Sequence, residues 1–189
     1  MKLTIACVNY GDYLGMGDRY VDALRRSVSR HLSRPYEFVC LKDEGDWPGW
    51  WSKIELFRPG RFKGRVVFFD LDGVVTGNLD RFVENKGIID LADWGWTTHT
   101  LCSTVMVWDG DEHRRIFDDF DWAVPQLYRG DQDWITAIGG WQILPKGFCC
   151  SYRYHAVRGI PRDCVHVSMH GRPKPHEITE GWVPATWDK

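Results

Sequence analysis

The sequence predicts an α/β protein in which a mainly parallel mixed sheet is flanked by helices, formed by residues 1–189 as a single domain. Short apolar runs of strand length alternate along the chain with segments of helical spacing, and that alternation favours a sheet covered on both faces. The length suits one domain with its own core, and the sequence contains no low-complexity segment or internal repeat. The apolar run 66–69 is typical of a strand buried on both faces, and it leads directly into two aspartates.

The first third of the chain predicts a strand, a helix and a second strand. Leu3–Val8 is an apolar run that ends in a polar and aromatic turn. Asp18 is expected to cap the following helix. The apolar positions of that helix follow helical spacing, at Val21, Leu24, Val28 and Leu32. Pro35 is expected to stop the helix, and Tyr36–Leu41 then forms the second strand.

The remaining chain continues the alternation. Helical segments are expected at Trp50–Phe57, at Asp111–Phe120, and from Asp131, as the capping residue, to Ile138. Strands are expected at 66–69, Cys102–Trp108 and Cys164–Met169.

Charge and cysteine usage narrow the class of protein. A formal charge of -2 gives no electrostatic case for tight binding to nucleic acid. The six cysteines show no paired metal spacing, and several lie in apolar runs, which suits free buried thiols in a reducing compartment. We find neither a signal peptide nor a stretch of membrane-spanning length, so we expect a soluble, cytoplasmic protein without a membrane segment.

Asp70 and Asp72 form the most informative pair of side chains in the sequence. Alternation in an extended chain places both on one face, with Leu71 pointing the other way. Carboxylates at the end of a buried strand stand at the sheet edge where α/β proteins bind ligands. They are ligands for a hard divalent cation such as Mn²⁺ or Mg²⁺, which in turn attracts phosphate. The alternative is an aspartate-rich turn, because Asp72-Gly73 also favours a turn.

Two known families share features with this segment. Phe69–Val75 resembles the first motif of haloacid-dehalogenase-type phosphatases, which would make Asp70 a nucleophile and Asp72 an acid/base. Those enzymes usually open their fold with this strand, whereas here two strands and two helical segments precede it. Their further motifs have weak candidates in this chain, namely Ser103, Lys146 and Asp118-Asp119. The two last aspartates fall in a helical pattern rather than at the end of a strand.

The second resemblance spans almost the whole chain. The sequence is similar to the GT-A-fold glycosyltransferases, in particular to the glycogenin and bacterial galactosyltransferase (family 8-like) group, whose fold is a Rossmann-like nucleotide-diphospho-sugar transferase fold. Its motifs occur in the family's order, as the turn 8–11, the helical segment 51–57 with Lys53, Asp70-Leu71-Asp72, the segment 102–107, Asp131-Gln132-Asp133 and the segment 168–175. Two positions depart from the family pattern. Cys102 replaces an asparagine, and Ser168 stands where the family has a metal-binding histidine.

This resemblance implies a metal-dependent glycosyltransferase that uses a nucleotide-sugar, most simply a UDP-sugar, and retains the anomeric configuration. The metal ligands it implies are Asp70, Asp72 and His170, with His170 taken because it shares the strand face of Ser168. His166 shares that face as well, and we expect it to be a hydrogen-bonded histidine within the strand, although it stays an alternative third ligand.

The resemblance also implies the residues that contact the substrates. Asp131 and Gln132 would act at the donor sugar and the reaction centre. The donor-binding residues would be Val8, Asn9, Tyr10, Tyr13, Lys53, Leu71, Ser103, Gly171, Arg172 and Lys174. The acceptor stays open between a glycan, a protein, a small molecule and a modified nucleobase. One of the tryptophan pairs, Trp50-Trp51 or Trp94 with Trp96, is a candidate to line the acceptor cleft, because aromatic faces suit sugar rings. A non-catalytic nucleotide-sugar-binding module is the alternative from another class.

Overall fold

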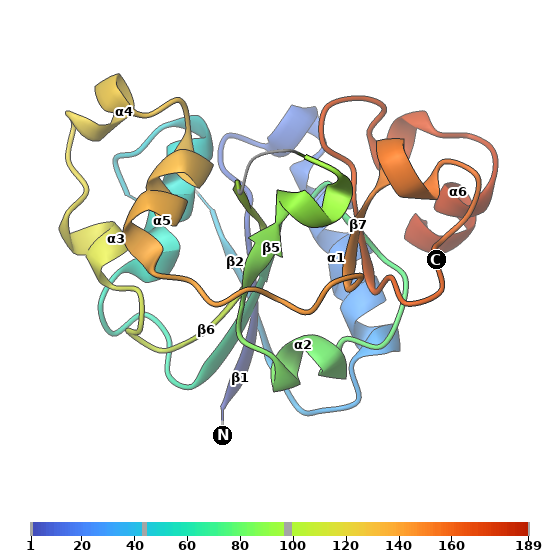
Figure 1. Cartoon of the computed structure of the whole chain (residues 1–189), viewed down its shortest axis with the longest axis horizontal. Helices are drawn as coiled ribbons and strands as arrows, with labels where there is room; N and C mark the ends of the chain where they lie inside the picture. The colour runs from blue at the N-terminus through green and yellow to red at the C-terminus, as the bar shows by residue number, and fades with distance from the viewer. Residues whose placement is uncertain (1, 43–44, 97–99, 189) are drawn as a thin grey trace.

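A computed structural model describes residues 2–42, 45–96 and 100–188. Its main sheet has five strands in the order β2-β1-β3-β6-β5 (Figure 1). Their bounds are Leu3–Val8 for β1, Glu37–Leu41 for β2, Arg65–Phe69 for β3, Gly87–Asp90 for β5 and Leu101–Asp109 for β6. β1 pairs in parallel with β2 and β3, whereas β6 pairs antiparallel with β3 and β5. The predicted mixed α/β sheet is confirmed, but only its β2-β1-β3 half is parallel.

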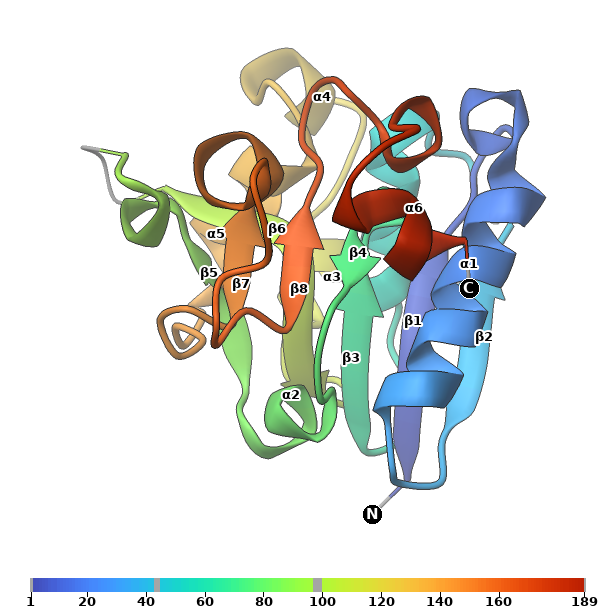
Figure 2. The ribbon, with the colours of Figure 1, turned by 90° about the vertical axis from the view of Figure 1, so that its right-hand side faces the viewer.

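A second, smaller sheet carries the end of the chain back to the centre of the molecule. It has the order β4-β8-β7, formed by Val74–Val75, His166–Ser168 and Cys149–Ser151. Figure 2 shows these three strands side by side beside the main sheet. β4 follows the two aspartates directly, so its pairing with β8 places the segment after residue 168 next to them.

Helices cover both faces of the main sheet (Figure 1). α1 and α6 lie on one side, and α3, α4 and α5 lie on the other. The α-helices span Gly17–His31 (α1), Asp80–Glu84 (α2), Arg115–Asp118 (α3), Val124–Leu127 (α4), Asp131–Gly139 (α5) and Trp182–Trp187 (α6). The 3₁₀ helices are η1 Tyr13–Gly15, η2 Gly49–Phe57, η3 Leu91–Trp94 and η5 Pro175–Glu177, and η4 Tyr152–Ala156 is a π-helix. None of the helices in the described ranges combines the length and the apolar character needed to cross a membrane.

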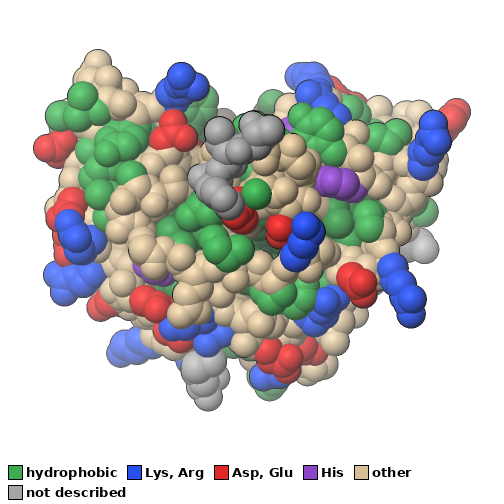
Figure 3. Space-filling view, in the orientation of Figure 1, with side chains coloured by type: hydrophobic (Ala, Val, Ile, Leu, Met, Phe, Trp, Pro, Cys, Tyr) green, Lys and Arg blue, Asp and Glu red, His purple; other side chains and the backbone are tan. Residues whose placement is uncertain are grey.

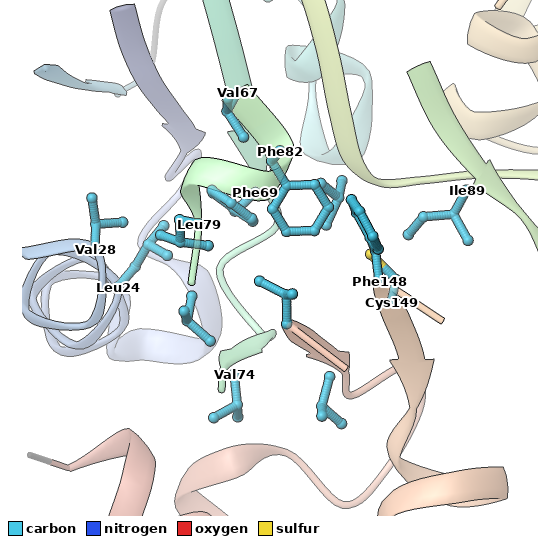
Figure 4. Packing of buried hydrophobic residues seen from close by; sticks show 14 of the residues in the cluster. Leu24, Val28, Val67, Phe69, Val74, Leu79, Phe82, Ile89, Phe148 and Cys149 are labelled. Carbon is cyan, nitrogen blue, oxygen red and sulfur yellow. The ribbon is translucent and has the colours of Figure 1, made fainter. Parts of the chain in front are cut away.

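Each face of the sheet has its own hydrophobic cluster. On the α1 side, Phe82 packs edge-on against Phe69 and Phe148, with ring centroids 5.7 Å and 5.8 Å away (Figure 4). On the α5 side, the fully buried Trp108 packs against Phe57 at a centroid distance of 5.1 Å. The strand between the two clusters is therefore buried on both faces, as the continuous apolar run 66–69 predicts.

The structure corrects two predicted helix caps. Asp18 lies inside the first turn of α1 and makes no capping bond, because Met16 is the capping residue. The carboxylate of Asp12 instead accepts a hydrogen bond of 2.7 Å from the amide of Gly17. Asp131 likewise begins α5 after Gly130 and does not cap it. A side chain from the preceding turn thus serves the start of α1, whereas α5 begins after Gly130 without a side-chain cap from the described residues.

Several predicted elements are shorter than expected or were missed. The helix predicted at Asp111–Phe120 is reduced to Arg115–Asp118, and the strand predicted at Cys164–Met169 to His166–Ser168. The helical segment around Lys53 is a 3₁₀ helix. β4, β5 and β7 have two to four residues each, and runs this short carry too little periodicity to be recognised.

Candidate functional site

A cavity of about 450 Å³ opens at the carboxyl ends of the parallel strands β1 and β3. Its lining residues are Val8, Tyr10, Tyr13, Gly49, Trp50, Ser52, Lys53, Asp70, Leu71, Asp72 and Asp131. The face of the molecule drawn in Figure 3 shows Asp and Glu side chains beside a Lys or Arg side chain near its centre, with hydrophobic side chains around them. Eight of the predicted site residues line this cavity, including both aspartates of the Asp-x-Asp motif.

The turn after β1 forms one wall. The buried side chain of Asn9 does not line the cavity, and its Oδ1 accepts a hydrogen bond of 2.9 Å from the amide of Tyr13. A Cβ atom on Gly17 would lie 2.2 Å from that oxygen, so the close approach of α1 requires glycine there. Asn9 thereby shapes the turn, and Tyr10 and Tyr13 line the cavity. The Tyr13 hydroxyl donates to Asp72 at 3.1 Å, and burial together with Asp72 raises the pKa of Tyr13.

Lys53 is the central cation of the site. Its ammonium lies 3.0 Å from Asp70 and 2.7 Å from Asp131, and it donates to the Ser103 hydroxyl at 3.3 Å. The side chains of Lys53 and Asp131 are each 11% exposed, and that of Asp70 is 29% exposed. Burial by itself favours the neutral amine, but Asp131 and Asp70 outweigh it and raise the pKa of Lys53. Burial raises the pKa of Asp70 to about 7, although Lys53 acts in the opposite direction.

Lys174 holds the second aspartate of the motif. Its ammonium forms an ion pair with Asp72 and donates to the carbonyl of Met169 at 3.2 Å. Its backbone amide donates to the Glu177 carboxylate at 2.7 Å, so the start of η5 fixes the backbone from which this side chain extends. The structure thus places the Lys174 side chain against Asp72, which lines the cavity, although Lys174 itself is not among the lining residues.

The start of β6 and the start of α5 meet beside Lys53. The hydroxyl of Ser103 donates to Asp131 at 3.4 Å, and its amide donates to the Gln132 side chain at 3.4 Å. Asp131 is buried, and its carboxylate is directed to Lys53 rather than to the helix start. The structure thus brings the predicted residues Ser103, Asp131 and Gln132 together at one end of the cavity.

The segment 170–172 is not brought to the cavity in the same way. The Nε2 atom of His170 lies 2.7 Å from the Ser151 hydroxyl, and its ring stacks on Trp94 at a centroid distance of 5.7 Å. Burial lowers the pKa of His170. Arg172 is exposed and forms an ion pair with Glu177. Neither His170 nor the two residues after it line the cavity.

His166 differs from the expectation. It is fully buried, and neither of its ring nitrogens has a hydrogen-bond partner among the described residues. Its ring lies against Phe69 and beneath Gly73, where an added Cβ atom would come within 1.9 Å of Nε2. Burial lowers the pKa of His166 to about 4, which keeps the ring neutral. The prediction of a hydrogen-bonded strand histidine is wrong, because the side chain packs among apolar groups and backbone.

The site fits a divalent cation only in part. Asp70 and Asp72 supply carboxylate oxygens, the donors that Mn²⁺ and Mg²⁺ prefer, and Mg²⁺ is commonly bound by one or two carboxylates together with waters and substrate phosphates. Within residues 2–42, 45–96 and 100–188, no three side chains of His, Cys, Asp or Glu are grouped so that they could hold a metal ion. The described part of the chain therefore contributes the pair of carboxylates, without a third ligand grouped beside them.

Three lining residues were not among the predicted donor contacts. Gly49, Trp50 and Ser52 belong to η2 and its start. Trp50 is 62% exposed, whereas the adjacent Trp51 is buried. The sequence indicated this wall of the cavity through the adjacent tryptophans, because two neighbouring rings cannot both be buried on the same face. Of the two candidate pairs, Trp50-Trp51 is the one with a residue, Trp50, that lines the cavity. Trp94 and Trp96 do not line it.

Comparison with known proteins supports the fold. No protein-family model matches the sequence, and no curated protein matches it. Among solved structures, the glycosyltransferase GlyE of Streptococcus pneumoniae TIGR4 superposes with a TM-score of 0.70 at 13% identity, covering 98% of this chain and 60% of GlyE. The galactosyltransferase LgtC, solved with donor and acceptor sugar analogs, gives 0.66 at 13% identity, covering 91% of this chain and 88% of LgtC.

A third solved glycosyltransferase structure is also similar in fold at low sequence identity. A glycosyltransferase involved in glycosylation of the major capsid of PBCV-1 gives a TM-score of 0.61 at 14% identity, covering 91% of this chain and 95% of that one. The chain spans 60% of the length of GlyE but most of the length of the other two. Identities this low bear on the fold alone. The chain therefore adopts the fold of the GT-A glycosyltransferases.

Proposed function

We propose that the protein is a metal-dependent glycosyltransferase that moves a sugar from a nucleotide-sugar, most simply a UDP-sugar, to a saccharide acceptor with retention of configuration. The observation that carries the proposal is the convergence of Asp70, Asp72, Lys53 and Asp131 with the turn after β1 in one cavity of about 450 Å³. Such a cavity has room for a ligand of nucleotide-sugar size. The GT-A fold and the order of the family-like motifs agree with this assignment.

The chemistry follows from charge. Breaking the bond between the sugar and the diphosphate places negative charge on the leaving phosphate oxygen, and catalysis requires groups that stabilise that charge. Asp70 and Asp72 would hold the Mn²⁺ or Mg²⁺ ion, which when bound supplies a Lewis acid at the diphosphate. Lys174, whose ammonium already lies at Asp72, would donate to the phosphate oxygens. Tyr10 and Tyr13, on the wall after β1, are placed to contact the nucleoside.

The opposite end of the cavity suits the sugar. Asp131 accepts from Lys53 and Ser103, which orients its carboxylate while leaving lone pairs for sugar hydroxyls. Gln132 is held by the amide of Ser103 at the same place. We assign to these residues the positioning of the donor sugar and of the anomeric carbon.

Trp50 favours a saccharide as the acceptor. Its exposed indole lies at the sugar end of the cavity, where its Nε1 is 3.5 Å from the position of a Cβ atom on Gly130. A flat apolar surface beside carboxylates suits a sugar ring, which has an apolar face and polar edges. The LgtC structure, which contains an acceptor sugar analog, agrees with this choice. We further place the protein in the cytoplasm, because all six cysteines are free thiols.

The phosphatase alternative finds no support in the geometry. Lys146 is 79% exposed and lies 3.8 Å from Asp93, away from Asp70. Asp118 and Asp119 form ion pairs on the surface of α3. The Asp70 carboxylate is engaged by Lys53, and Ser103, the third nominated group, contacts Lys53 and Asp131.

Thermal unfolding with a panel of nucleoside diphosphates and nucleotide-sugars tests the proposal. Ligand binding to the folded state raises its apparent stability, so a UDP-sugar with Mn²⁺ should raise the melting temperature, and a chelator should abolish the rise. Asp72→Asn should remove the metal-dependent rise while unfolding cooperatively. Transfer of sugar to a saccharide separates an enzyme from a binding module. An equal rise in the presence of chelator would refute metal dependence, and no rise with any nucleotide-sugar would refute the function.

A further inference from the structure

The three carboxylates of the cavity already share two ammonium groups. Lys53 lies between Asp70 and Asp131, at 3.0 Å and 2.7 Å, and Lys174 forms an ion pair with Asp72. Each carboxylate of the Asp-x-Asp motif is thus paired with a lysine. Lys174 is 14% exposed and Asp72 17% exposed, so water screens this pair only weakly.

Lys53 and Lys174 differ in how easily each could leave its carboxylate partner. Lys53 contacts Asp70, Asp131 and Ser103 from within η2, and its ammonium also lies over the ring of Phe68. Among the described residues, the Lys174 ammonium has one carboxylate partner and one carbonyl partner, Met169, and its backbone is held separately by Glu177. The Lys174 side chain can therefore swing away from Asp72 without breaking the attachment of its segment.

A divalent cation and the Lys174 ammonium compete for the same carboxylate. Two positive groups on one carboxylate repel each other, so a cation at Asp72 weakens the ion pair with Lys174 and favours movement of that ammonium away from Asp72. Displacement leaves that ammonium poorly solvated unless an anion receives it. A diphosphate is such an anion. Without the cation, however, it would enter a cavity whose three carboxylates exceed its two ammonium groups.

We propose that Lys174 acts as a resident counter-ion of Asp72 that moves to the donor diphosphate when the metal binds, and that this exchange makes metal and diphosphate bind cooperatively. The inference rests on the proposed function and adds a binding order to it. The free protein holds the cation weakly, and the diphosphate draws Lys174 off Asp72. The absence of a third protein ligand beside the two aspartates in the described ranges works in the same direction.

Equilibrium binding of Mn²⁺ to the free protein, measured by the electron paramagnetic resonance signal of unbound Mn²⁺, tests this directly. Lys174→Met removes the competing charge, so Mn²⁺ alone should bind about tenfold more tightly or better. The same variant should bind UDP in the presence of Mn²⁺ at least about tenfold more weakly. Lys174→Arg keeps the charge, so it should bind Mn²⁺ alone as the parent does.

Lys2→Met is the matched control. It removes the same charge and frees the carboxylate of Glu37, but that pair lies at the other end of β1 and both side chains are more than half exposed. It should leave Mn²⁺ affinity unchanged, and a thermal melt of each variant checks folding. If Lys174→Met leaves the affinity for Mn²⁺ alone unchanged or lowers it, the exchange is wrong.

The outcomes separate this inference from the proposed function. UDP that binds the parent only with Mn²⁺, together with unchanged Mn²⁺ affinity in Lys174→Met, would overturn the exchange and leave the function standing. A parent that binds UDP under no condition would overturn both. A parent that binds Mn²⁺ alone as tightly as it binds Mn²⁺ in saturating UDP would overturn the cooperativity.

Discussion

Replacing Lys53 with methionine tests whether the centre of the site is a buried charge cluster. The substitution keeps most of the side-chain volume and removes the ammonium that Asp70 and Asp131 share. It leaves two carboxylates near each other with the Ser103 hydroxyl as the remaining donor to Asp131. We expect the folded protein to lose stability because uncompensated charge stays in a poorly solvated place.

The expected loss of unfolding free energy depends on how deeply the two carboxylates are buried. Removing one partner of a buried ion pair costs about 3–5 kcal/mol. Asp131 is 11% exposed but Asp70 is 29% exposed, so water relieves part of the penalty and we expect the lower end, about 3 kcal/mol. With a urea dependence of about 2 kcal/mol per molar, the midpoint of unfolding should fall by about 1.5 M.

The loss should depend on pH. Burial raises the pKa of Asp70 to about 7, and removing Lys53, which lowers it, raises it further. A carboxyl group whose pKa is higher in the folded state than its value of about 3.9 in the unfolded state binds protons preferentially when folded. Its penalty is present above the folded pKa and disappears as the pH falls toward the unfolded value. The variant should therefore be closer to the parent at pH 5 than at pH 8.

Urea unfolding in chelator at both pH values measures these effects. Lys2→Met, which breaks an exposed pair, should change stability by less than about 1 kcal/mol. Adding Asp131→Asn to Lys53→Met should recover part of the loss, because it removes one of the two unpaired charges. A loss under about 1 kcal/mol at pH 8, with no dependence on pH, would refute a buried charge cluster.

Three further predictions concern function. Gln132→Ala should bind UDP with Mn²⁺ as the parent does but turn over more slowly, because Gln132 lies at the sugar end; an equal loss of UDP affinity in titration calorimetry would contradict that placement. Trp50→Ala should change unfolding by less than about 0.5 kcal/mol yet weaken saccharide acceptors in kinetic assays, whereas Trp51→Ala should lose about 3–5 kcal/mol of stability. Aryl phosphates should not be hydrolysed, and a phosphoryl group trapped on Asp70 would revive the phosphatase alternative.

Local pattern was enough wherever a residue's role depends on its own strand or helix. The apolar runs predicted β1, β2, β3 and β6 to within one or two residues. Both Asp70 and Asp72 line the cavity, but the prediction that Leu71 points to the other face is wrong, because Leu71 lines the same cavity. The amide of Gly73 donates to the carbonyl of Asp70 at 3.4 Å, so the backbone turns after β3 and the period of two of an extended chain no longer applies.

Local sequence pattern could not predict how segments that are distant in the sequence pair with one another. Helical spacing identified α1 but misassigned its cap, since the amide of Gly17 is satisfied by Asp12 from the preceding turn. Strand character identified β6 but not its antiparallel direction, which depends on the route of the chain between β3 and β6. The strands β4 and β7 exist mainly because β8 lies between them.

The sequence by itself determined the class of fold, the edge of the sheet at which the cavity lies and the residue types that meet there, because apolar periodicity and the position of carboxylates after a strand are local properties. Only the tertiary structure decided which charges share a partner. Lys174 reaches Asp72 across 102 residues, and Lys53 binds two carboxylates from different elements. It also decided that the ring nitrogens of His166 are buried without a hydrogen-bond partner in the described part of the chain, and that His170 bonds to Ser151. The physical reason is that a polar side chain takes whichever partner the packed chain brings within about 3 Å, and spacing in sequence does not specify that partner.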